Sequence, residues 1–253
     1  MKMPCMLVCL MVALAGCATA PALDPNVPAR PGVSSDVVFE EVDGLVAVEA
    51  EHFFEQTRTD VRAWYLTTAA HTPSIEPDAD GPHVDGAAGG AYLEILPDTR
   101  QTPADALVRG GNFTEDAGTM AVLSYRVHIH APGRYYVWAR IYSTGPDDNG
   151  LHVGLDGTWP PSGRRMQWIA KRRWVWGSKQ RTADVHTGVP GLLYLDIDTP
   201  GEHTIHFAMR EDGTEFDKWL MTLDRLDTVE GDGPPERVKP GHPPRAFGGA
   251  KKK

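Results

Sequence analysis

The chain has 253 residues, of which 34 are Asp or Glu and 25 are Lys or Arg, so its formal net charge is −9. This excess of acid weighs against a nucleic-acid-binding protein, because a negatively charged surface repels a polyanion. The length is enough for one folded domain with a substantial hydrophobic core.

Residues 1–16 resemble the signal peptide of a bacterial lipoprotein. Lys2 gives a charged start, and an apolar run too short to span a bilayer covers residues 6–15. The run ends in Leu14-Ala15-Gly16-Cys17, which resembles a lipobox and implies cleavage before Cys17, with lipid such as palmitate attached to that residue. A plain secretory peptide cleaved near Ala20 is the alternative.

The lipobox resemblance has consequences for location and for the cysteines. Lipid attachment implies an extracytoplasmic protein held at a membrane by its lipid, and Ala18 after the cysteine favours the bacterial outer membrane. Cys5 and Cys9 leave with the leader and Cys17 carries the lipid. The mature domain is therefore expected to have no disulfide, thiolate metal site or cysteine nucleophile.

Two segments of low apolar content flank the expected domain. Residues 17–36 are rich in Pro and small side chains, which predicts an extended tether. Residues 229–253 contain mostly Pro, Gly and charged side chains, which predicts a disordered basic tail. A single folded domain is therefore expected over residues 37–228.

Several runs in this domain alternate apolar and polar residues with period two, which is typical of half-buried strands. The predicted strands are residues 45–53, 120–130, 134–142, 150–157, 192–198, 203–210 and 216–224. Ala131-Pro132-Gly133 is a turn signal that predicts a hairpin. No segment has a sustained helical period. The sequence therefore predicts an all-β chain folded as an antiparallel β-sandwich.

The order of four motifs resembles one group of families. The strings VAVEAEHF, APGRYYVWARIYS, WVW and PGEHTIHFAMREDGTEFDKWLMT follow one another within residues 40–226. Together they resemble carbohydrate-binding modules of families 6 and 35, and more closely the C-terminal β-sandwich of family 115 glycoside hydrolases. The resemblance implies a galactose-binding-like jelly roll that binds sugar and holds a structural calcium ion.

Two glutamates lie close together near the start of the domain. Glu49 and Glu51 are two apart in a predicted strand, so their carboxylates are expected on one side of it. The resemblance implies that both bind Ca²⁺, together with Asp217 at the start of the last strand. An exposed acidic face paired with Arg or Lys is one alternative. An acid/base pair of a glycosidase is another, which the resemblance disfavours because it places this pair away from the sugar.

The segment from Gly157 to Ala183 has no Asp or Glu but holds four Trp and seven Lys or Arg. An indole stacks on the C–H face of a sugar ring, and an Arg fork fits a carboxylate or sulfate, so the composition favours an acidic polysaccharide. The resemblance implies an aromatic platform at Trp174 or Trp176 and a second aromatic at Tyr92. The predicted carbohydrate-binding residues are Tyr92, Trp168, Arg172, Arg173, Trp174 and Trp176. Core packing of these indoles is the alternative.

The histidines and known catalytic motifs bear on whether the chain is an enzyme. His128 and His130 share a face of one predicted strand and could bind a transition metal or act as a base, but no third ligand is evident near them in the sequence. There is no nucleophile elbow, P-loop or dinucleotide fingerprint. Polysaccharide lyases also use jelly rolls with Tyr or His bases, so a lyase remains an alternative.

The sequence thus predicts a non-catalytic, calcium-containing, lipid-anchored protein that captures a uronic or sulfated polysaccharide at the cell surface. Glycan-degrading enzymes are expected partners, and nucleic acid is not. A structural or protein-binding envelope lipoprotein is the third interpretation.

Overall fold

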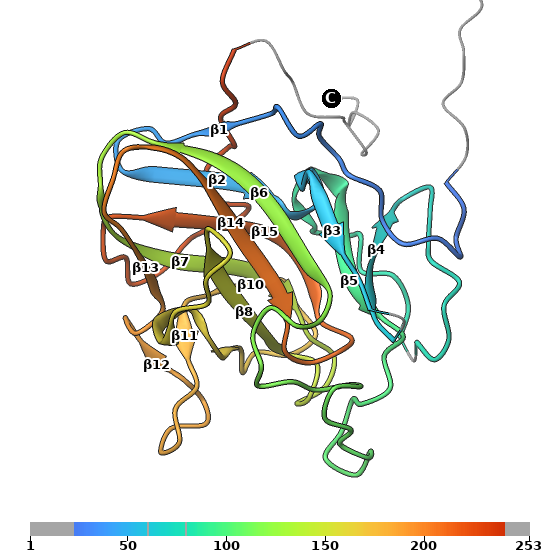
Figure 1. Cartoon of the computed structure of the whole chain (residues 1–253). Coiled ribbons are helices and arrows are strands. Elements are labelled where there is room, and N and C mark those ends of the chain that lie inside the picture. The colour runs from blue at the N-terminus through green and yellow to red at the C-terminus, as the bar shows by residue number, and fades with distance from the viewer. Residues whose placement is uncertain (1–22, 60, 79, 241–253) are drawn as a thin grey trace, which may run out of the picture.

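The computed structural model describes residues 23–59, 61–78 and 80–240 (Figure 1). The predicted leader and the lipidation site at Cys17 lie outside the described residues. Three short 3-10 helices interrupt the strands, at Ala50–His52 (η1), Ala88–Gly90 (η2) and Pro161–Gly163 (η3). No helix in the described ranges is long and apolar enough to cross a membrane.

One sheet has eight strands. They are Phe39–Glu40 (β1), Glu55–Thr57 (β3), Val122–Ile129 (β6), Gly150–Leu155 (β8), Met166–Gln167 (β9), Lys179–Gln180 (β11), Val189–Pro190 (β12) and Gly201–Met209 (β14). Their order is β1-β6-β14-β8-β9-β11-β12, and β3 also pairs with β6. The β1–β6 pair is parallel and the other pairs of this sheet are antiparallel.

The second sheet has seven strands and is antiparallel throughout. They are Leu45–Glu49 (β2), Ala63–Thr68 (β4), Ala91–Leu96 (β5), Gly133–Tyr142 (β7), Val175–Gly177 (β10), Tyr194–Ile197 (β13) and Glu215–Thr222 (β15). Their order is β10-β7-β15-β5-β4, with β13 paired to β7 and β2 paired to β15. The predicted antiparallel β-sandwich is confirmed.

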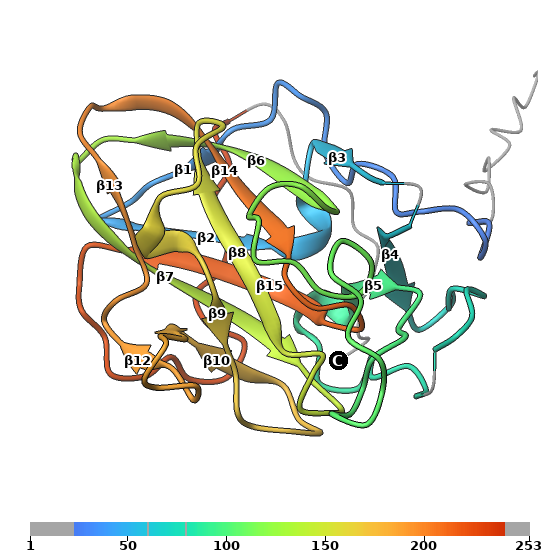
Figure 2. The same ribbon diagram turned by 60° about the horizontal axis from the view of Figure 1, so that its bottom comes forward.

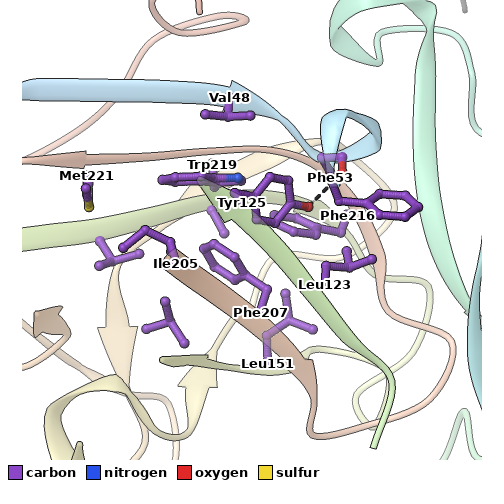
Figure 3. Close-up of a cluster of buried hydrophobic side chains, with 14 of the residues drawn as sticks. Val48, Phe53, Leu123, Tyr125, Leu151, Ile205, Phe207, Phe216, Trp219 and Met221 are labelled. Atoms are coloured by element: carbon purple, nitrogen blue, oxygen red, sulfur yellow. Dashed lines mark hydrogen bonds between the residues drawn. The ribbon is translucent and has the colours of Figure 1, made fainter. Parts of the chain in front are cut away.

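The hydrophobic core lies between the sheets and is rich in aromatic rings (Figure 3). Phe207 of β14 lies 4.9 Å from Phe216 and 5.5 Å from Trp219 between ring centroids. Tyr125 of β6 meets Trp219 edge-on at 5.2 Å, and its hydroxyl donates a hydrogen bond of 2.7 Å to the Ala50 carbonyl. The inward-facing residues of the central strands are therefore large and apolar, which agrees with the predicted alternation of apolar and polar residues.

The structure corrects three details of the sequence prediction. The strand predicted over residues 45–53 ends at Glu49, and the chain turns into η1 there. Part of the predicted tether packs on the domain, because the Ala29 amide donates to the Trp64 carbonyl at 2.8 Å. Part of the predicted tail also packs, since residues 237–239 run beside β1 and Val238 forms a bridge with Phe39.

Replacement of Phe207 by Ala should lower the melting temperature strongly. The substitution removes a ring with no exposed surface from contact with three other aromatic residues. Such a cavity costs about 3–5 kcal/mol of unfolding free energy, which corresponds to roughly 6–20 °C for a domain of this size. Scanning calorimetry measures the shift, with Val61→Ala at a 45% exposed position as the control. A shift no larger than that of the control would contradict this account of the core.

Candidate functional site

The basic aromatic segment, defined as residues 163–181, passes from one sheet to the other (Figure 2). It contains β9 and β11 of the eight-stranded sheet, and between them β10, which pairs with β7 at the edge of the seven-stranded sheet. The indoles of this segment therefore contact different layers and have different environments.

Trp168 is the indole that the structure places in the interior. Its side chain belongs to the main core and is only 3% exposed. Gly177 makes room for it, because a Cβ atom there would lie 2.2 Å from the Trp168 Nε1 atom. The predicted role of Trp168 as a stacking platform is thus corrected: its ring offers no open face, and core packing explains its presence.

Trp174 lies half-buried in an aromatic group that includes the predicted Tyr92. Their ring centroids are 5.3 Å apart, and Tyr142 meets Trp174 edge-on at 5.5 Å. The indole N–H donates to the His83 carbonyl at 2.9 Å. Tyr92 itself is 1% exposed, so it supports Trp174 from below and presents no platform of its own. Burial raises the pKa of Tyr92, so its hydroxyl stays protonated.

Trp176 is held on the outer side of the seven-stranded sheet. It packs on Trp138 and Leu220 in a small separate apolar cluster. Its indole N–H donates to the Gly231 carbonyl at 3.0 Å. The C-terminal segment therefore fixes the orientation of Trp176, and the ring remains half-buried.

A groove of about 570 Å³ lies beside Trp176, and we call it the cationic groove. Its lining includes the aromatic residues Tyr136, Trp138, Trp168 and Trp176, the apolar residues Ile169 and Leu226, the cations Arg173, Lys179 and Arg225, and the acid Asp227. Ile169 is 56% exposed. Within the described chain, no carboxylate forms an ion pair with the three cations. The groove thus combines apolar faces with an excess of positive charge, because three cations and one acid line it.

The two predicted arginines are separated by the structure. Arg173 lines the cationic groove, whereas Arg172 is absent from its lining. The backbone of Arg172 has a φ of 55°, and its amide donates to the Ser143 carbonyl at 2.8 Å. Of the six predicted carbohydrate-binding residues, the structure therefore brings Arg173 and Trp176 together at a surface groove, with Trp168 beneath it.

A second group of polar side chains lies beside Trp174, and we call it the carboxylate cluster: Asp78, Asp80, His83, Glu94 and Glu215. The ligand atoms of Asp80, His83 and Glu215 lie within 4.8 Å of one another, and so do those of Asp78, Asp80 and Glu94. His83 shares a hydrogen bond of 2.6 Å between its Nδ1 and Glu215 Oε1, and stacks on Tyr142 at 3.7 Å. The sequence patterns considered above do not predict this cluster, although Asp78-x-Asp80 in a loop that contains Pro and Gly is a recognisable signal for it.

Burial and mutual repulsion control the protonation of the carboxylate cluster. Burial raises the pKa of Glu215 to about 7, although the hydrogen bond with His83 acts to lower it. Burial, with a hydrogen bond and charge from Asp80, raises the pKa of Asp78 to about 6. Burial and the Glu215 charge raise the pKa of Glu94 well above its usual range. At neutral pH these groups can hold either protons or a divalent cation.

The predicted calcium ligands also lie near one another, but with cations between them. Glu49 Oε1 accepts a hydrogen bond of 2.7 Å from Lys218 Nζ, and Asp217 Oδ2 accepts one from Arg140 Nη1. Glu51 is 3% exposed and lies on η1, so the expectation that Glu49 and Glu51 share one strand face is wrong.

Each of these three residues has a carboxylate oxygen that is available to a cation. Glu49 Oε2, Glu51 Oε2 and Asp217 Oδ1 are each buried without a hydrogen-bond partner. Burial, followed by the charge of Glu49, raises the pKa of Glu51 well above its usual range. Burial raises the pKa of Asp217 to about 7, although Arg140 opposes the shift. Unpaired buried oxygen atoms are costly, and a hard cation such as Ca²⁺ accepts such ligands.

Comparisons with known proteins leave the ligand open. No protein-family model matches the chain. A curated, uncharacterized protein of Formosa agariphila is 50% identical over 219 residues, which cover 86% of this chain and 53% of that protein. The chain therefore spans about half the length of this relative.

Solved structures show limited likeness. A Podospora anserina GH26-CBM35 β-(1,4)-mannanase is 14% identical, with a TM-score of 0.40 over 74% of this chain and 29% of that chain. A family 35 carbohydrate-binding module from Clostridium thermocellum is 12% identical, with a TM-score of 0.37 over 70% of this chain and 96% of that chain. A CBM35 from Paenibacillus barcinonensis is 14% identical, with a TM-score of 0.40 over 70% and 98%. Likeness at this level assigns no ligand to this chain.

The stability of the metal-free protein should fall as pH rises from about 5 to about 7.5. The pKa values of Glu215 and Asp217 are about 7 in the folded chain, above the ordinary range of unfolded carboxyl groups near 4. The folded state thus holds protons that the unfolded chain has released, so raising the pH favours unfolding. Melting temperatures measured with a chelator present test this. Glu215→Gln should reduce the slope, whereas Asp105→Asn at an exposed site should not. A flat or rising profile would contradict the assignment.

Proposed function

We propose that this chain is a non-catalytic carbohydrate-binding β-sandwich that binds an acidic polysaccharide in the cationic groove. The observation that carries the proposal is the lining of the groove, where Arg173, Lys179 and Arg225 have no ion-pair partner in the described chain and lie among aromatic and apolar side chains. The motif order of the sequence, which resembles carbohydrate-binding modules, supports the same class of ligand.

The lining suits a charged sugar chain in two ways. Trp176 and Ile169 can contact the C–H face of a sugar ring, which is the apolar side of an otherwise polar ligand. Arg173 and Arg225 can donate paired hydrogen bonds to a carboxylate or sulfate group. A neutral glycan would use the apolar contacts but leave the cations unsatisfied. The volume of about 570 Å³ lies within the range of small-ligand sites.

Calcium belongs to the proposal as a structural ion held by Glu49, Glu51 and Asp217. The three buried oxygen atoms without partners support it. An ion there would supply positive charge beside Glu51, whose carboxylate forms no ion pair with any described residue. The residues would have to share their charge between the ion and the existing partners Arg140 and Lys218.

The proposed location is extracytoplasmic, at the bacterial outer membrane, through lipid on Cys17. Only the lipobox resemblance supports this, because the residue lies outside the described part of the chain. A lipid-held sandwich could present captured glycan to degrading enzymes at the cell surface.

A glycan-active enzyme, such as a lyase, is the second candidate. The specific observation that favours it is the His83–Glu215 pair, in which a buried carboxyl group with a pKa of about 7 contacts an imidazole beside Tyr142. Groups of this kind can exchange protons near neutral pH. Turnover distinguishes the candidates, because a lyase forms unsaturated products that absorb in the ultraviolet.

Removal of groove cations should weaken binding of acidic glycans. Arg173→Ala combined with Arg225→Ala deletes two charge-assisted contacts and should reduce affinity for polygalacturonate or a sulfated galactan by about 100-fold or more, since hydrogen bonds to charged groups contribute about 1.5–3 kcal/mol each. Affinity electrophoresis or calorimetry measures the change. Arg172→Ala is the matched control, because this neighbouring exposed cation does not line the groove.

The outcomes separate the candidates. Binding of acidic glycans by the unmodified protein, loss in the double variant, retention in the Arg172 variant and no absorbing product would support the proposal. Equal loss in both variants would contradict the groove as the site. Accumulation of unsaturated product would favour the lyase. No binding to any glycan would favour a structural or protein-binding role.

Calcium should stabilise the protein at neutral pH through Glu51. A ligand present at about 100 times its dissociation constant adds about 2.7 kcal/mol to the unfolding free energy, or roughly 5–11 °C for a domain of this size. Thermal melts of chelator-treated protein with and without CaCl₂ measure this. Glu51→Gln should remove the shift, whereas Glu55→Gln at an exposed position should keep it. Calcium-induced stabilisation that persists in the Glu51 variant would place the ion elsewhere.

A further inference from the structure

Strand β6 carries His128, and His130 directly follows its last residue, Ile129, on the outer face of the eight-stranded sheet. Its residues Val127 and Ile129 have no exposed surface and point into the core, so His128 and His130 point the other way. The two imidazole rings lie 4.6 Å apart between centroids and are tilted by 52°. They are therefore close enough to approach one ligand from two sides.

The parallel partner strand supplies the third group that the sequence did not reveal. Glu40 of β1 is in register with His128, and its neighbour Phe39 is fully buried, so the Glu40 side chain is on the outer face too. His130 Nε2 lies 2.5 Å from Glu40 Oε1. The ligand atoms of Glu40, His128 and His130 all lie within 4.8 Å of one another.

Two atoms of this group lack partners. The Nδ1 atom of His128 and the Oε2 atom of Glu40 are both buried, and neither forms a hydrogen bond. A buried polar atom without a partner costs free energy, and its presence in a folded protein calls for a ligand, an ion or water. Here the two atoms belong to neighbouring residues that are directly paired across two strands, so one bound species could satisfy both.

We propose that Glu40, His128 and His130 bind a divalent transition-metal ion, with Zn²⁺ as the reference ion. Two imidazole nitrogens and one carboxylate oxygen form a donor set that Zn²⁺ accepts at about 2.0–2.2 Å in tetrahedral geometry. Small side-chain rotations bring donors that now lie within 4.8 Å of one another to that geometry. Water completes the coordination, with Glu202 next to the site because it is in register with His128 on β14.

The donor set distinguishes this site from the calcium ligands of the proposed function. Imidazole nitrogen suits zinc, copper and nickel, whereas Ca²⁺ takes oxygen ligands. The two sites also lie on different sheets and share no residue, so either can exist without the other.

The metal would have a structural consequence at the edge of the sheet. Strand β1 has two residues, and the C-terminal segment is attached to it through Arg237, whose carbonyl accepts the Glu40 amide hydrogen at 2.8 Å. An ion that joins Glu40 to His128 would fasten β1, and with it this segment, to β6. Zinc should therefore raise the melting temperature.

Titration of the full chain with ZnCl₂ in excess CaCl₂ tests the proposal. We expect saturation at one Zn²⁺ per chain and affinity reduced by at least about 100-fold in His128→Ala and in Glu40→Gln, since even removal of outer contacts to ligands costs 10–100-fold. His186→Ala, an exposed histidine away from the group, should retain full affinity. Melting temperatures without metal verify that each variant is folded.

Cu²⁺ gives a second measurement that does not depend on stability. The electron paramagnetic resonance spectrum should show coupling to two nitrogen nuclei in the unmodified chain and to one in His130→Ala. Unchanged Zn²⁺ affinity in His128→Ala and Glu40→Gln would overturn the proposal. Loss of zinc binding in His83→Ala with retention in His128→Ala would also overturn it, because the carboxylate cluster would then be the zinc site.

Discussion

Strand β15 is buried along its whole length although it carries Glu215, Asp217 and Lys218, and the sandwich must compensate for this. Removing one partner of a buried ion pair costs about 3–5 kcal/mol, so neighbouring strands have to supply opposite charges. Arg140 of β7 pairs with Asp217, and Glu49 of β2 pairs with Lys218. The central position of β15, between β7 and β5 with β2 also paired to it, makes both contacts available.

This charge compensation is incomplete. The carboxylates that remain without a cationic partner explain why two regions of the domain favour cations. Glu51 lies beside Glu49 and Asp217, and Glu94 lies beside Glu215, so in each region carboxylates outnumber the cations that pair with them. Buried carboxylates in excess must take up protons or bind metal, because isolated charge is poorly solvated there. Near neutral pH the protonation of these groups therefore affects both the stability of the fold and the electrostatic field around Trp174.

Among the strands of four or more residues in the described ranges, the sequence predicted all but β4 and β5. In β6 the partly exposed Arg126 and His128 alternate with the buried Tyr125, Val127 and Ile129, so period two is visible. Strands β4 and β5 pair with each other and are buried at every position, so they lack the alternation. For the site, the sequence indicated that the basic aromatic segment combines cations with indoles. It did not indicate that Trp168 is buried, because that depends on the residues of the main core that pack over it. The sequence also could not show that Glu40 lies beside His128, because this depends on the parallel pairing of β1 with β6, which are far apart in the chain.

Opposite charges near Trp174 and Trp176 limit how an anionic glycan could lie on this surface. Trp176 borders the cationic groove, whereas Trp174 is bonded to the loop of His83, next to the carboxylate cluster. Where the carboxyl groups of this cluster are deprotonated, their charge would repel an anionic glycan near Trp174. A glycan in the groove would thus be favoured at one end and repelled at the other. Loading the carboxylate cluster with a divalent ion would remove that repulsion, so the length of glycan bound, and not only the stability of the fold, should depend on the metal.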